Sequence, residues 1–592
     1  MQDFIFNVYC QRISRQSKYQ VTFSYNLQLI DRIKNLPQEQ RKYNKDNNYW
    51  EITTRGLYSL IKSYKGSTKL HFDFGEEEGR KEFKEQIKKI DAEEIEKERI
   101  IKELNEKKIY WYNFKEDLEN NYEQYIDIIH KNLKPEVKLY TYQVCATIFL
   151  NKVKNVLLAL DMGTGKSIIS IAYIEMNDFK KVLVITPNSL KFNYYNEVEK
   201  FTNSKAYIIN WNKNKYTIEE SKYIIINYDF FNSSNKEGAN KKYFNLNIDD
   251  KIECIIVDEC QKIKNTKNNI YKNYKRFFSR KQISKVFMSG TPMCNRTYEL
   301  YSVLNQISPI EFPTKKFFYE YYCGMTYDSG SDYGGWISIG DIKFEELYNK
   351  ISPYTYRKRK EEILPDLPDK TYQKILLELN EKEKNIYDEI ESGIANEFIA
   401  DSNLNPLTRM LRLRQYTSSL KIKNINDIID EIIDNNEKVV IIDVFKDVLN
   451  EIHEKYKNIS VLHTGDFSVS ERNEMVTIFQ DENSNIKIFL GTISTANFGL
   501  TLTAASKMLL LTLPYSVGEY DQISDRIHRI GQKNSVMIYP IIYIDTIDEY
   551  VFDLLEKKMI EITKTLDNKE YNTTYVDVTM NDIINKLKEK YV

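Results

Sequence analysis

Asn155-Val-Leu-Leu-Ala-Leu-Asp-Met-Gly-Thr-Gly-Lys-Ser167 is the stretch that decides the fold of this chain. The apolar run from Val156 to Leu160 predicts a buried strand, and the pattern that begins at Ser167 predicts a helix. A glycine loop between a strand and a helix is the setting of a phosphate-binding loop, whereas the alternative is a plain turn. The strict motif has a glycine where this chain has Leu160, so the loop by itself is an imperfect match.

The residue types of this loop suit nucleotide phosphates. Gly163 and Gly165 have no Cβ, so their backbone N–H groups can approach phosphate oxygens. Lys166 would neutralise the β- and γ-phosphates, and the Ser167 hydroxyl would ligate Mg²⁺. The ATP-binding residues predicted here are Asp161, Met162, Gly163, Thr164, Gly165, Lys166 and Ser167.

Composition narrows the class of protein. A chain of 592 residues with a net charge of −1 has room for three or more domains. Its six cysteines form no C-x₂-C pair, which predicts no structural zinc and a reducing compartment. No apolar run reaches the length of a membrane span, and the N-terminus lacks the basic start of a signal peptide. We expect a soluble intracellular protein without a membrane partner, cytoplasmic if its source is bacterial or viral and nuclear if it is eukaryotic.

Residues 1–75 predict a small basic module. Alternating apolar residues at 19–23 and the run Tyr49–Ile52 predict strands, with helices following at 27–36 and 57–64. Residues 1–74 hold twelve Lys and Arg against six Asp and Glu, although the whole chain is nearly neutral. That surplus favours binding to a DNA backbone, and the alternative is a solvated positive face. Trp50 either anchors the core or stacks on a base.

Residues 76–136 predict a charged helical connector. Lys and Glu dominate from Glu76 to Lys108, with apolar residues at roughly helical spacing. The pattern is typical of one long helix or a helical hairpin, with a break at Pro135.

The next segment predicts a parallel α/β lobe. Strands are expected at Val182–Thr186, Tyr223–Asn227, Cys254–Val257 and Lys285–Ser289. Upstream of the glycine loop, Tyr142 precedes Gln143, whose amide offers the donor and acceptor that suit the edge of adenine. Asp258 and Glu259 follow a buried strand. Asp258 would hold Mg²⁺, and Glu259 would orient and deprotonate the attacking water. Ser289, Gly290 and Thr291 either link the γ-phosphate site to another lobe or form a simple turn.

A second strand–helix alternation predicts a second parallel lobe. Strands are expected at Val439–Ile442, Ser460–His463, Ile486–Leu490, Met508–Leu513 and Val536–Tyr543, after a helical stretch at 381–435. Arg409, Arg412 and Arg414 in that stretch either meet phosphates or are surface charges. Arg526 and Arg529 lie three apart, so on a helix they share a face and suit the charge of a transferring phosphoryl group.

With these motifs together, the chain resembles a superfamily 2 helicase-type motor of the Swi/Snf branch. The resemblance rests on Tyr142-Gln143, Asp161–Ser167, Pro187–Leu190, Asp258–Gln261 and Gly290–Asn295. Departures are Leu160 for an acidic residue, Gln261 for histidine, Cys294 for glutamine and Tyr194 for tryptophan. Residues 19–52 are similar to the HARP domain of annealing helicases, with Tyr25, Pro37, Tyr43 and Trp50 at the matching positions. The loop around Ala496-Asn-Phe-Gly499 also resembles the annealing-helicase form.

The resemblance implies an α/β fold with two tandem RecA-like parallel-sheet lobes and helical insertions, preceded by a small α+β HARP-like domain. The expected domains are 1–75 (HARP-like), 76–136 (connector), 137–370 (lobe 1 with protrusion and bridge), 371–565 (lobe 2) and 566–592 (accessory tail). The segment at 309–370 is either a surface loop or the annealing-helicase insertion, with Arg357-Lys-Arg-Lys360 in the bridge between lobes.

The resemblance also implies further site residues. Gly499 joins the ATP-binding residues, and the coupling residues are Gln261, Ser289, Gly290, Thr291 and Gln522. The expected DNA contacts are Ser189, Lys191, Asn227, Thr464, Gly465, Thr495, Thr501, Arg41, Lys42 and Trp50.

These observations predict an ATP- and Mg²⁺-dependent translocase on double-stranded DNA that remodels or reanneals forks without reading sequence. Intact Lys166, Asp258, Glu259, Arg526 and Arg529 argue against the alternative of a non-catalytic DNA-binding scaffold. A transcription or nucleosome remodeller of the same branch is the other alternative. The sequence does not indicate which proteins, if any, the chain binds.

Overall fold

A computed structural model describes residues 6–13, 17–36, 40–63, 70–75, 77–209, 211, 213–231, 251–278, 283–328, 335–400, 406–496 and 500–569. The chain divides into two compact units, Met1–Ile109 and Tyr110–Val592, which are described separately.

Unit 1 contains a five-stranded sheet in the order β3-β4-β2-β1-β5. Its strands are β1 (Phe6–Arg12), β2 (Lys18–Phe23), β3 (Arg41–Asn44), β4 (Tyr49–Thr53) and β5 (Leu70–Asp73), with helices α1 (Leu27–Asn35) and α2 (Thr54–Ser63). Buried Val21, Ile33 and Leu57 join these elements in one core. The sequence predicted only β2 and β4 of these strands. β3 and β5 have four residues each and lack a long apolar alternation, and the seven-residue β1 was also missed.

The charged connector begins as one long helix, α3 (Glu77–Asn120), which starts in unit 1 and ends in unit 2. Of the two predicted forms, one long helix is the observed one, because α3 runs unbroken. Pro135 lies in a turn as predicted, but α3 already ends at Asn120, well before it. No glycine or proline occurs between Gly79 and Pro135, so nothing in the sequence forces a turn within α3. Arg99 is paired with Glu96 and Glu103 on successive turns.

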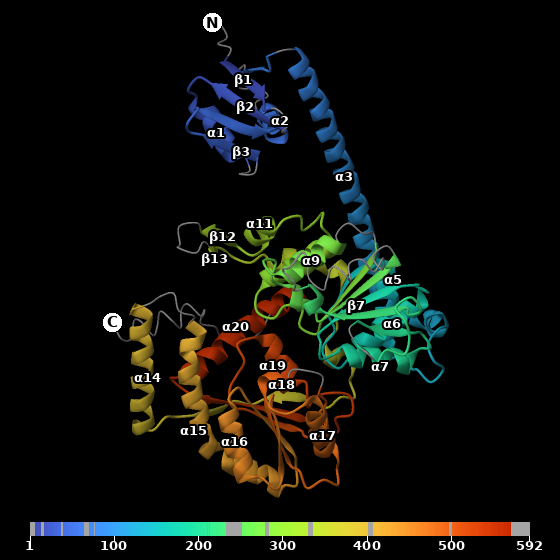
Figure 1. The fold of residues 1–592 in the computed structure, drawn as a ribbon, viewed down its shortest axis with the longest axis vertical. Coiled ribbons are helices and arrows are strands. Elements are labelled where there is room, and N and C mark those ends of the chain that lie inside the picture. The colour runs from blue at the N-terminus through green and yellow to red at the C-terminus, as the bar shows by residue number, and fades with distance from the viewer. Residues whose placement is uncertain are drawn as a thin grey trace. The chain divides into compact units, whose positions relative to one another are not determined.

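The first lobe of unit 2 is a parallel sheet in the order β14-β6-β11-β10-β7-β9-β8. Its strands are β6 (Asn155–Leu158), β7 (Val182–Thr186), β8 (Ala206–Ile208), β9 (Tyr223–Asn227), β10 (Cys254–Asp258), β11 (Ser284–Met288) and β14 (Thr355–Tyr356). The helices that accompany it are α4 (Ile126–His130), α5 (Thr141–Val153), α6 (Lys166–Met176), α7 (Lys191–Phe201), α9 (Asn269–Phe278) and α10 (Tyr301–Ile307). Figure 1 shows α5, α6 and α7 around this sheet, so its apolar strands are enclosed as a parallel sheet requires.

An insertion lies between α10 and β14 of the first lobe. It contains α11 (Lys315–Phe317), the hairpin β12 (Met325–Asp328) and β13 (Gly335–Ser338), and α12 (Phe344–Ile351). The insertion is packed rather than a loose surface loop, since Phe318, Tyr322 and Leu347 are buried. The short helix α13 (Lys360–Ile363) lies in the segment that leads to the second lobe.

The second lobe is another parallel sheet, in the order β15-β21-β20-β17-β19-β18, with β16 also on β21. Its strands are β15 (Lys370–Tyr372), β16 (Ile375–Leu377), β17 (Val439–Asp443), β18 (Ser460–His463), β19 (Ile488–Thr492), β20 (Lys507–Leu510) and β21 (Val536–Tyr543). Its helices are α14 (Glu381–Ala400), α15 (Pro406–Asp434), α16 (Lys446–Lys455), α17 (Val469–Gln480), α18 (Ile493–Ala496), α19 (Val517–Ser524) and α20 (Ile547–Asp567). The two lobes confirm the predicted fold class of paired parallel-sheet domains.

Alternate residues of β17 face different cores. Val439 and Ile441 pack in the cluster that includes Ile425 of α15, whereas Val440 and Ile442 pack in the cluster that includes Val551 of α20. This second cluster continues into the insertion of the first lobe. The hydrophobic core therefore crosses between the lobes through α20, which packs on α12.

Candidate nucleotide site between the lobes

The glycine loop has the backbone that its sequence predicts. Gly163 and Gly165 adopt positive φ angles of 75° and 79°. The loop closes on the Lys166 ammonium, which donates to the carbonyls of Leu160 and Asp161 at 3.0 and 3.1 Å. Burial lowers the pKa of Lys166, and the carboxylates of Glu259 and Asp258 act against that shift. The Lys166 ammonium therefore lies between the glycine loop and the carboxylates of Asp258 and Glu259.

Two side chains from α5 hold this loop. The Tyr142 hydroxyl and the Gln143 amide nitrogen both donate to the Thr164 carbonyl, at 2.7 and 3.1 Å. The Gln143 amide oxygen accepts from the Tyr140 N–H at 3.0 Å. Both ends of this amide thus bind the protein's own backbone, and the contact of Gln143 with adenine stays a prediction.

Asp258 and Glu259 stand at the carboxyl end of β10. The Thr186 hydroxyl donates to Asp258 at 2.9 Å, and burial together with the Glu259 charge raises the pKa of Asp258 to about 7. Glu259 has a positive φ of 51° and accepts from the Gln261 amide at 2.7 Å. An Asp carboxylate and the Ser167 hydroxyl are hard oxygen donors of the kind Mg²⁺ prefers, so the residues present fit this ion.

The residues predicted to couple the lobes meet the second lobe here. The Ser289 hydroxyl lies 3.5 Å from the Glu259 carboxylate and accepts from the Thr291 N–H at 2.9 Å. A Cβ added at Gly518 of α19 would lie 3.2 Å from the Thr291 hydroxyl, and one added at Gly290 would strike Met162. The motif is therefore packed between the glycine loop and α19 rather than an isolated turn.

The two arginines reach the loop from the second lobe, but not from a helix. α19 ends at Ser524, and Arg526 and Arg529 lie in the turns that follow, so their predicted helical placement is wrong. The helix stops because the N–H of Arg526 bonds the nearer carbonyl of Ile523, a tighter turn than α-helix. Burial and the neighbouring Arg529 lower the pKa of Arg526 to about 9. A Cβ on Gly163 would lie 3.4 Å from Arg529.

One cavity of about 590 Å³ brings these groups together. Its lining from the first lobe includes Gly163, Gly165, Lys166, Ser167, Asp258, Glu259 and Gln261, and its lining from the second lobe includes Gln522, Arg526 and Arg529. Gly499 lies outside the described residues.

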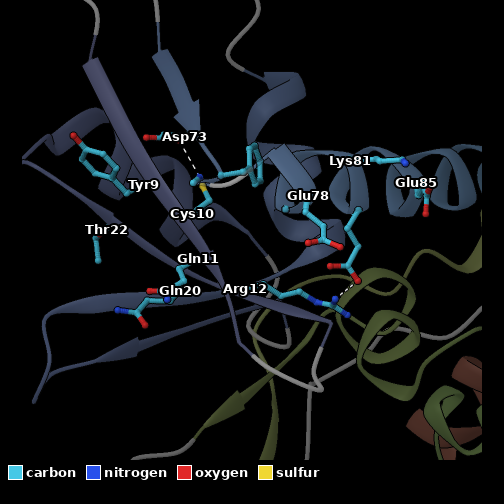
Figure 2. A pocket seen from close by; sticks show the side chains of 14 residues that line it. Tyr9, Cys10, Gln11, Arg12, Gln20, Thr22, Asp73, Glu78, Lys81 and Glu85 are labelled. Carbon is cyan, nitrogen blue, oxygen red and sulfur yellow. Dashed lines mark hydrogen bonds and ion pairs between the residues drawn. The ribbon is translucent and has the colours of Figure 1, made fainter.

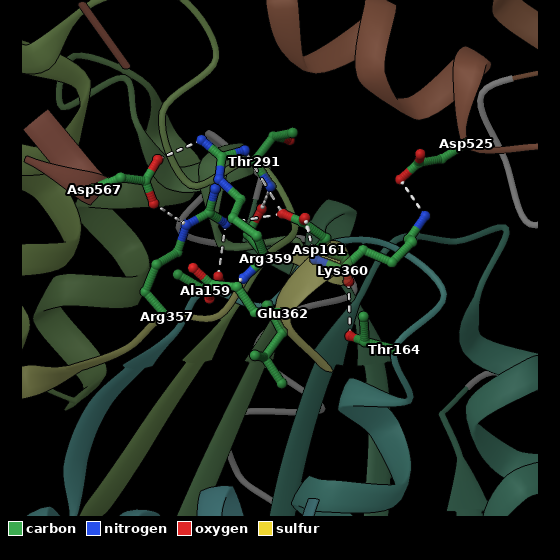
Figure 3. Close-up of polar contacts among 12 residues, drawn as sticks. Ala159, Asp161, Thr164, Thr291, Arg357, Arg359, Lys360, Glu362, Asp525 and Asp567 are labelled. Atoms are coloured by element: carbon green, nitrogen blue, oxygen red, sulfur yellow. Dashed lines mark hydrogen bonds and ion pairs between the residues drawn. The ribbon is translucent and has the colours of Figure 1, made fainter. Parts of the chain in front are cut away.

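Charged residues that sequence reasoning did not pair connect the lobes beside this cavity (Figure 3). Arg357 donates to Asp161 of the glycine loop at 3.1 Å and to Asp567 of α20 at 3.0 Å. Lys360 donates to Asp525 at 2.9 Å, and Asp525 precedes Arg526 directly. Lys370 also binds Asp525, at 2.9 Å. The basic bridge in the sequence was a signal for these contacts, whereas its acidic partners lie far away along the chain.

The predicted DNA contacts of unit 2 differ in how accessible they are. Ser189 and Gly465 are exposed. Asn227 is half-buried and binds Asn188 and Asp229. Lys191 is half-buried and lies over the Phe192 ring.

Three threonines use their hydroxyls internally. Thr464 and Thr495 are buried, with Thr464 bound to Asp466 and Thr495 bound to the His463 carbonyl. Thr501 accepts from Arg529 at 3.2 Å. The hydroxyls of Thr464 and Thr495 are therefore occupied within the protein, and a DNA contact of either residue stays a prediction.

The basic run of α15 shows a structural role at one position. Arg414 is buried over the Tyr515 ring at 4.3 Å and donates to the Leu513 carbonyl, so it is neither a surface charge nor open to phosphate. Arg412 is exposed, and the side chain of Arg409 lies outside the described residues.

In unit 1 the candidates lie on the strands β3 and β4. Lys42 is exposed, Arg41 donates to the Leu36 carbonyl at 2.8 Å, and Trp50 packs on Tyr43 and the edge of the core. Of its two predicted roles, Trp50 has the structural one of packing against the core of unit 1.

A cavity of about 880 Å³ in unit 1 is lined by more acidic than basic side chains, in contrast to the basic surplus of residues 1–74. Figure 2 shows Arg12 pointing toward the helix that carries Glu78 and Glu85, and Arg12 pairs there with Glu82. Asp73 also lines this cavity. Its acidic lining is unsuited to phosphate, so an anionic partner of unit 1 would have to bind elsewhere on it.

Three findings concern the cysteines, membrane-spanning helices and metal sites. All six cysteines are free and buried. No helix in the described part of the chain is long and apolar enough to span a membrane. Within the same residues, no group of three or more His, Cys, Asp or Glu side chains is arranged to hold a metal ion.

Comparison with known protein families gave two matches. The model of the SNF2-related domain matches residues 35–457, and that of the helicase conserved C-terminal domain matches residues 421–531.

The chain is also similar to individual proteins. An uncharacterised ATP-dependent helicase of Mycoplasma genitalium is 27% identical over 438 residues, which are 69% of this chain and 40% of that protein. The DNA annealing helicase and endonuclease ZRANB3 of Homo sapiens is 26% identical over 471 residues, covering 76% and 42%. The chain thus spans about two fifths of the length of these relatives. The SWI2/SNF2 ATPase core of Sulfolobus solfataricus in complex with double-stranded DNA is 23% identical, covers 74% of this chain and 98% of its own, and has a TM-score of 0.34.

Proposed function

The chain belongs to the SNF2-related family, and from that premise we propose that it hydrolyses ATP to translocate on double-stranded DNA and to remodel or reanneal forked or branched DNA. The observation that carries the ATPase proposal is the shared cavity. It is lined by Lys166, Asp258 and Glu259 from one lobe and by Arg526 and Arg529 from the other.

Each group has a role that its position supports. Lys166 binds the β- and γ-phosphates within the glycine loop, and Ser167 with Asp258 would hold Mg²⁺. Bound Mg²⁺ would neutralise charge on the phosphate oxygens. Glu259 orients and deprotonates the attacking water, and its carboxylate is held for this by Gln261. Arg526 and Arg529 stabilise the negative charge that develops on the γ-phosphoryl oxygens.

Because the site is split, nucleotide turnover couples to the relative position of the lobes. Gln261, Ser289 and Thr291 lie between the water-activating carboxylate and α19, so they are the proposed coupling path. Both lobes would grip one DNA strand. The proposed contacts are Ser189, Lys191 and Asn227 from the first lobe, and Gly465, Thr495 and Thr501 from the second. A grip through phosphates is independent of sequence.

The preference for forks is the finer part of the proposal. It is supported by the basic surplus of residues 1–74 and by the similarity to a relative named as an annealing helicase. In unit 1, Arg41 and Lys42 are the proposed phosphate contacts. Charge reversal at both residues is expected to lower fork reannealing more than it lowers ATPase.

The test of the whole proposal is ATPase rate with no DNA, single strand, duplex and fork at one stated salt concentration. We expect stimulation by duplex and fork, and its loss in Lys166→Ala but not in the control Lys180→Ala, an exposed residue paired with Asp178. Equal near-zero rates for the unmodified protein and Lys166→Ala would indicate a non-catalytic scaffold. Stimulation by linear duplex equal to that by forks would favour the remodeller alternative.

A further inference from the structure

A third carboxylate, Glu197 of α7, lines the nucleotide cavity beside Ser167 and Asp258. Its Oε2 atom is buried and has no hydrogen-bond partner. Glu199, two residues later on the same helix, differs: its carboxylate accepts from the Tyr195 hydroxyl at 3.1 Å and from Lys215 at 2.6 Å. A buried oxygen without a partner costs stability, which indicates that Glu197 has a partner in a liganded state.

The helix holds Glu197 firmly toward the glycine loop. The Tyr194 hydroxyl bonds the Ser170 hydroxyl at 2.8 Å, which ties α7 to α6. Glu197 follows Tyr194 by three residues, so the two side chains share one face of α7. The carboxylate is thereby held against the first turn of α6, where Ser167 lies.

The Glu197 carboxylate interacts with Ser167 and Asp258. Burial raises the pKa of Glu197, and the Ser167 hydroxyl and Lys200 act against that rise. Glu197 also contributes to the raised pKa of Asp258, after burial and Glu259. The Glu197 carboxylate therefore interacts with Ser167 and with Asp258, the two residues that would hold Mg²⁺.

A serine hydroxyl that ligates a cation turns a lone pair to the metal, so its O–H group points away and donates a hydrogen bond to another acceptor. We propose that Glu197 is a positioning residue for magnesium, whose carboxylate accepts a hydrogen bond from the Ser167 hydroxyl and so aims the hydroxyl oxygen at the ion. This inference rests on the proposed function. In this role Glu197 does not touch the metal but orients the side chain that does. Loss of such an orienting group typically weakens metal binding about 10- to 100-fold.

The experiment measures binding of a fluorescent ADP analogue to the full chain while Mg²⁺ is titrated. For Glu197→Gln we expect the Mg²⁺ concentration at half-maximal binding to rise about 10-fold or more, with binding in EDTA unchanged. The matched control Glu199→Gln removes a charge from the same helix and is expected to stay within about twofold of the unmodified protein. Glu197→Asp keeps a carboxylate and is expected to recover part of the loss.

A double variant tests whether Glu197 acts through Ser167. If it does, Ser167→Ala with Glu197→Gln requires no more Mg²⁺ than Ser167→Ala alone, because the two effects are not additive. An unchanged Mg²⁺ requirement in Glu197→Gln overturns the inference, as does an equal loss of binding with and without Mg²⁺. If Glu197→Gln does not fold, a loss of Mg²⁺ affinity in Glu197→Asp that adds in full to the loss in Ser167→Ala overturns it. Failure of the unmodified protein to bind any nucleotide would instead refute the proposed function.

Discussion

The guanidinium of Arg357 lies 3.1 Å from the carboxylate of Asp161, so the segment that crosses between the lobes is bonded directly to the glycine loop. The same guanidinium lies 3.0 Å from Asp567, the last residue of α20. Both Arg357 and Asp567 are buried, with side chains 9% and 7% exposed. The Arg357 guanidinium therefore joins the candidate nucleotide site to the end of the helix that packs across the lobes.

Removal of Asp567 is expected to destabilise the protein. Asp567→Ala leaves Arg357 and Arg359 with one carboxylate, Asp161, in place of two, and breaking a buried ion pair costs about 3–5 kcal/mol. Urea denaturation of the full chain should show a lower midpoint. The control is Lys569→Ala, which removes an exposed pair with Glu362 and should leave the midpoint nearly unchanged. Equal midpoints for both variants would contradict the role of Asp567.

Arg526 and Arg529 are expected to act on the chemical step. Replacement of either by alanine should lower kcat of the DNA-stimulated ATPase about 10³-fold while nucleotide affinity changes much less, since these charges act mainly in the transition state. Lys533→Ala is the control, because Lys533 is exposed and pairs with Glu482 at the surface. Steady-state rates and equilibrium nucleotide binding separate the two effects. A loss confined to affinity would show that the arginines only bind substrate.

Gly165 is expected to tolerate no side chain. Gly165→Ala would place a Cβ 2.6 Å from the Gln143 amide nitrogen at a φ of 79°, which strains the loop and breaks the bond from Gln143 to Thr164. Nucleotide binding should fall at least about 10-fold by fluorescence titration. Gly393→Ala is the matched control, because its Cβ would meet open space within α14. That change should stabilise the protein by about 0.5–1 kcal/mol. Normal binding by Gly165→Ala would show that the loop can adjust.

Asp521 is expected to make stability depend on pH. Burial and the nearby Asp525 raise the pKa of Asp521 to about 6, although Lys370 and Arg359 favour its charge. The unfolded chain ionises this carboxyl at lower pH than the folded chain, so its contribution to stability is lost as pH rises from about 4 to about 6. Asp521→Asn should therefore match the unmodified protein near pH 4.5 and exceed it at pH 7 by roughly 1–3 kcal/mol.

The measurement for Asp521 is the difference in thermal midpoint between the two proteins across pH 4.5–8. A difference that is constant with pH would assign the effect to packing rather than to charge. A sign opposite to the prediction would show that the cations around Asp521 outweigh its burial.

Local elements followed from the sequence. The predicted strands Val182–Thr186, Tyr223–Asn227, Ser460–His463 and Val536–Tyr543 have those same bounds in the structure. Short apolar runs between polar turns can be buried in an α/β sheet in few ways, so the pattern alone predicts them. The edge strands of unit 1 escaped prediction, since pairing with a neighbour rather than an apolar pattern creates them.

By itself, the sequence determined the two parallel lobes, the glycine loop and the residue types of a split nucleotide site. Only the tertiary structure decided that Arg357 joins Asp161 to Asp567, that Arg526 and Arg529 enter the cavity from turns, and that Glu197 lies beside Ser167. Periodicity and loop chemistry act over a few neighbouring residues, so a sequence displays them directly. The pairing of charges hundreds of residues apart depends on how packed lobes bring their edges together, and no local pattern records it.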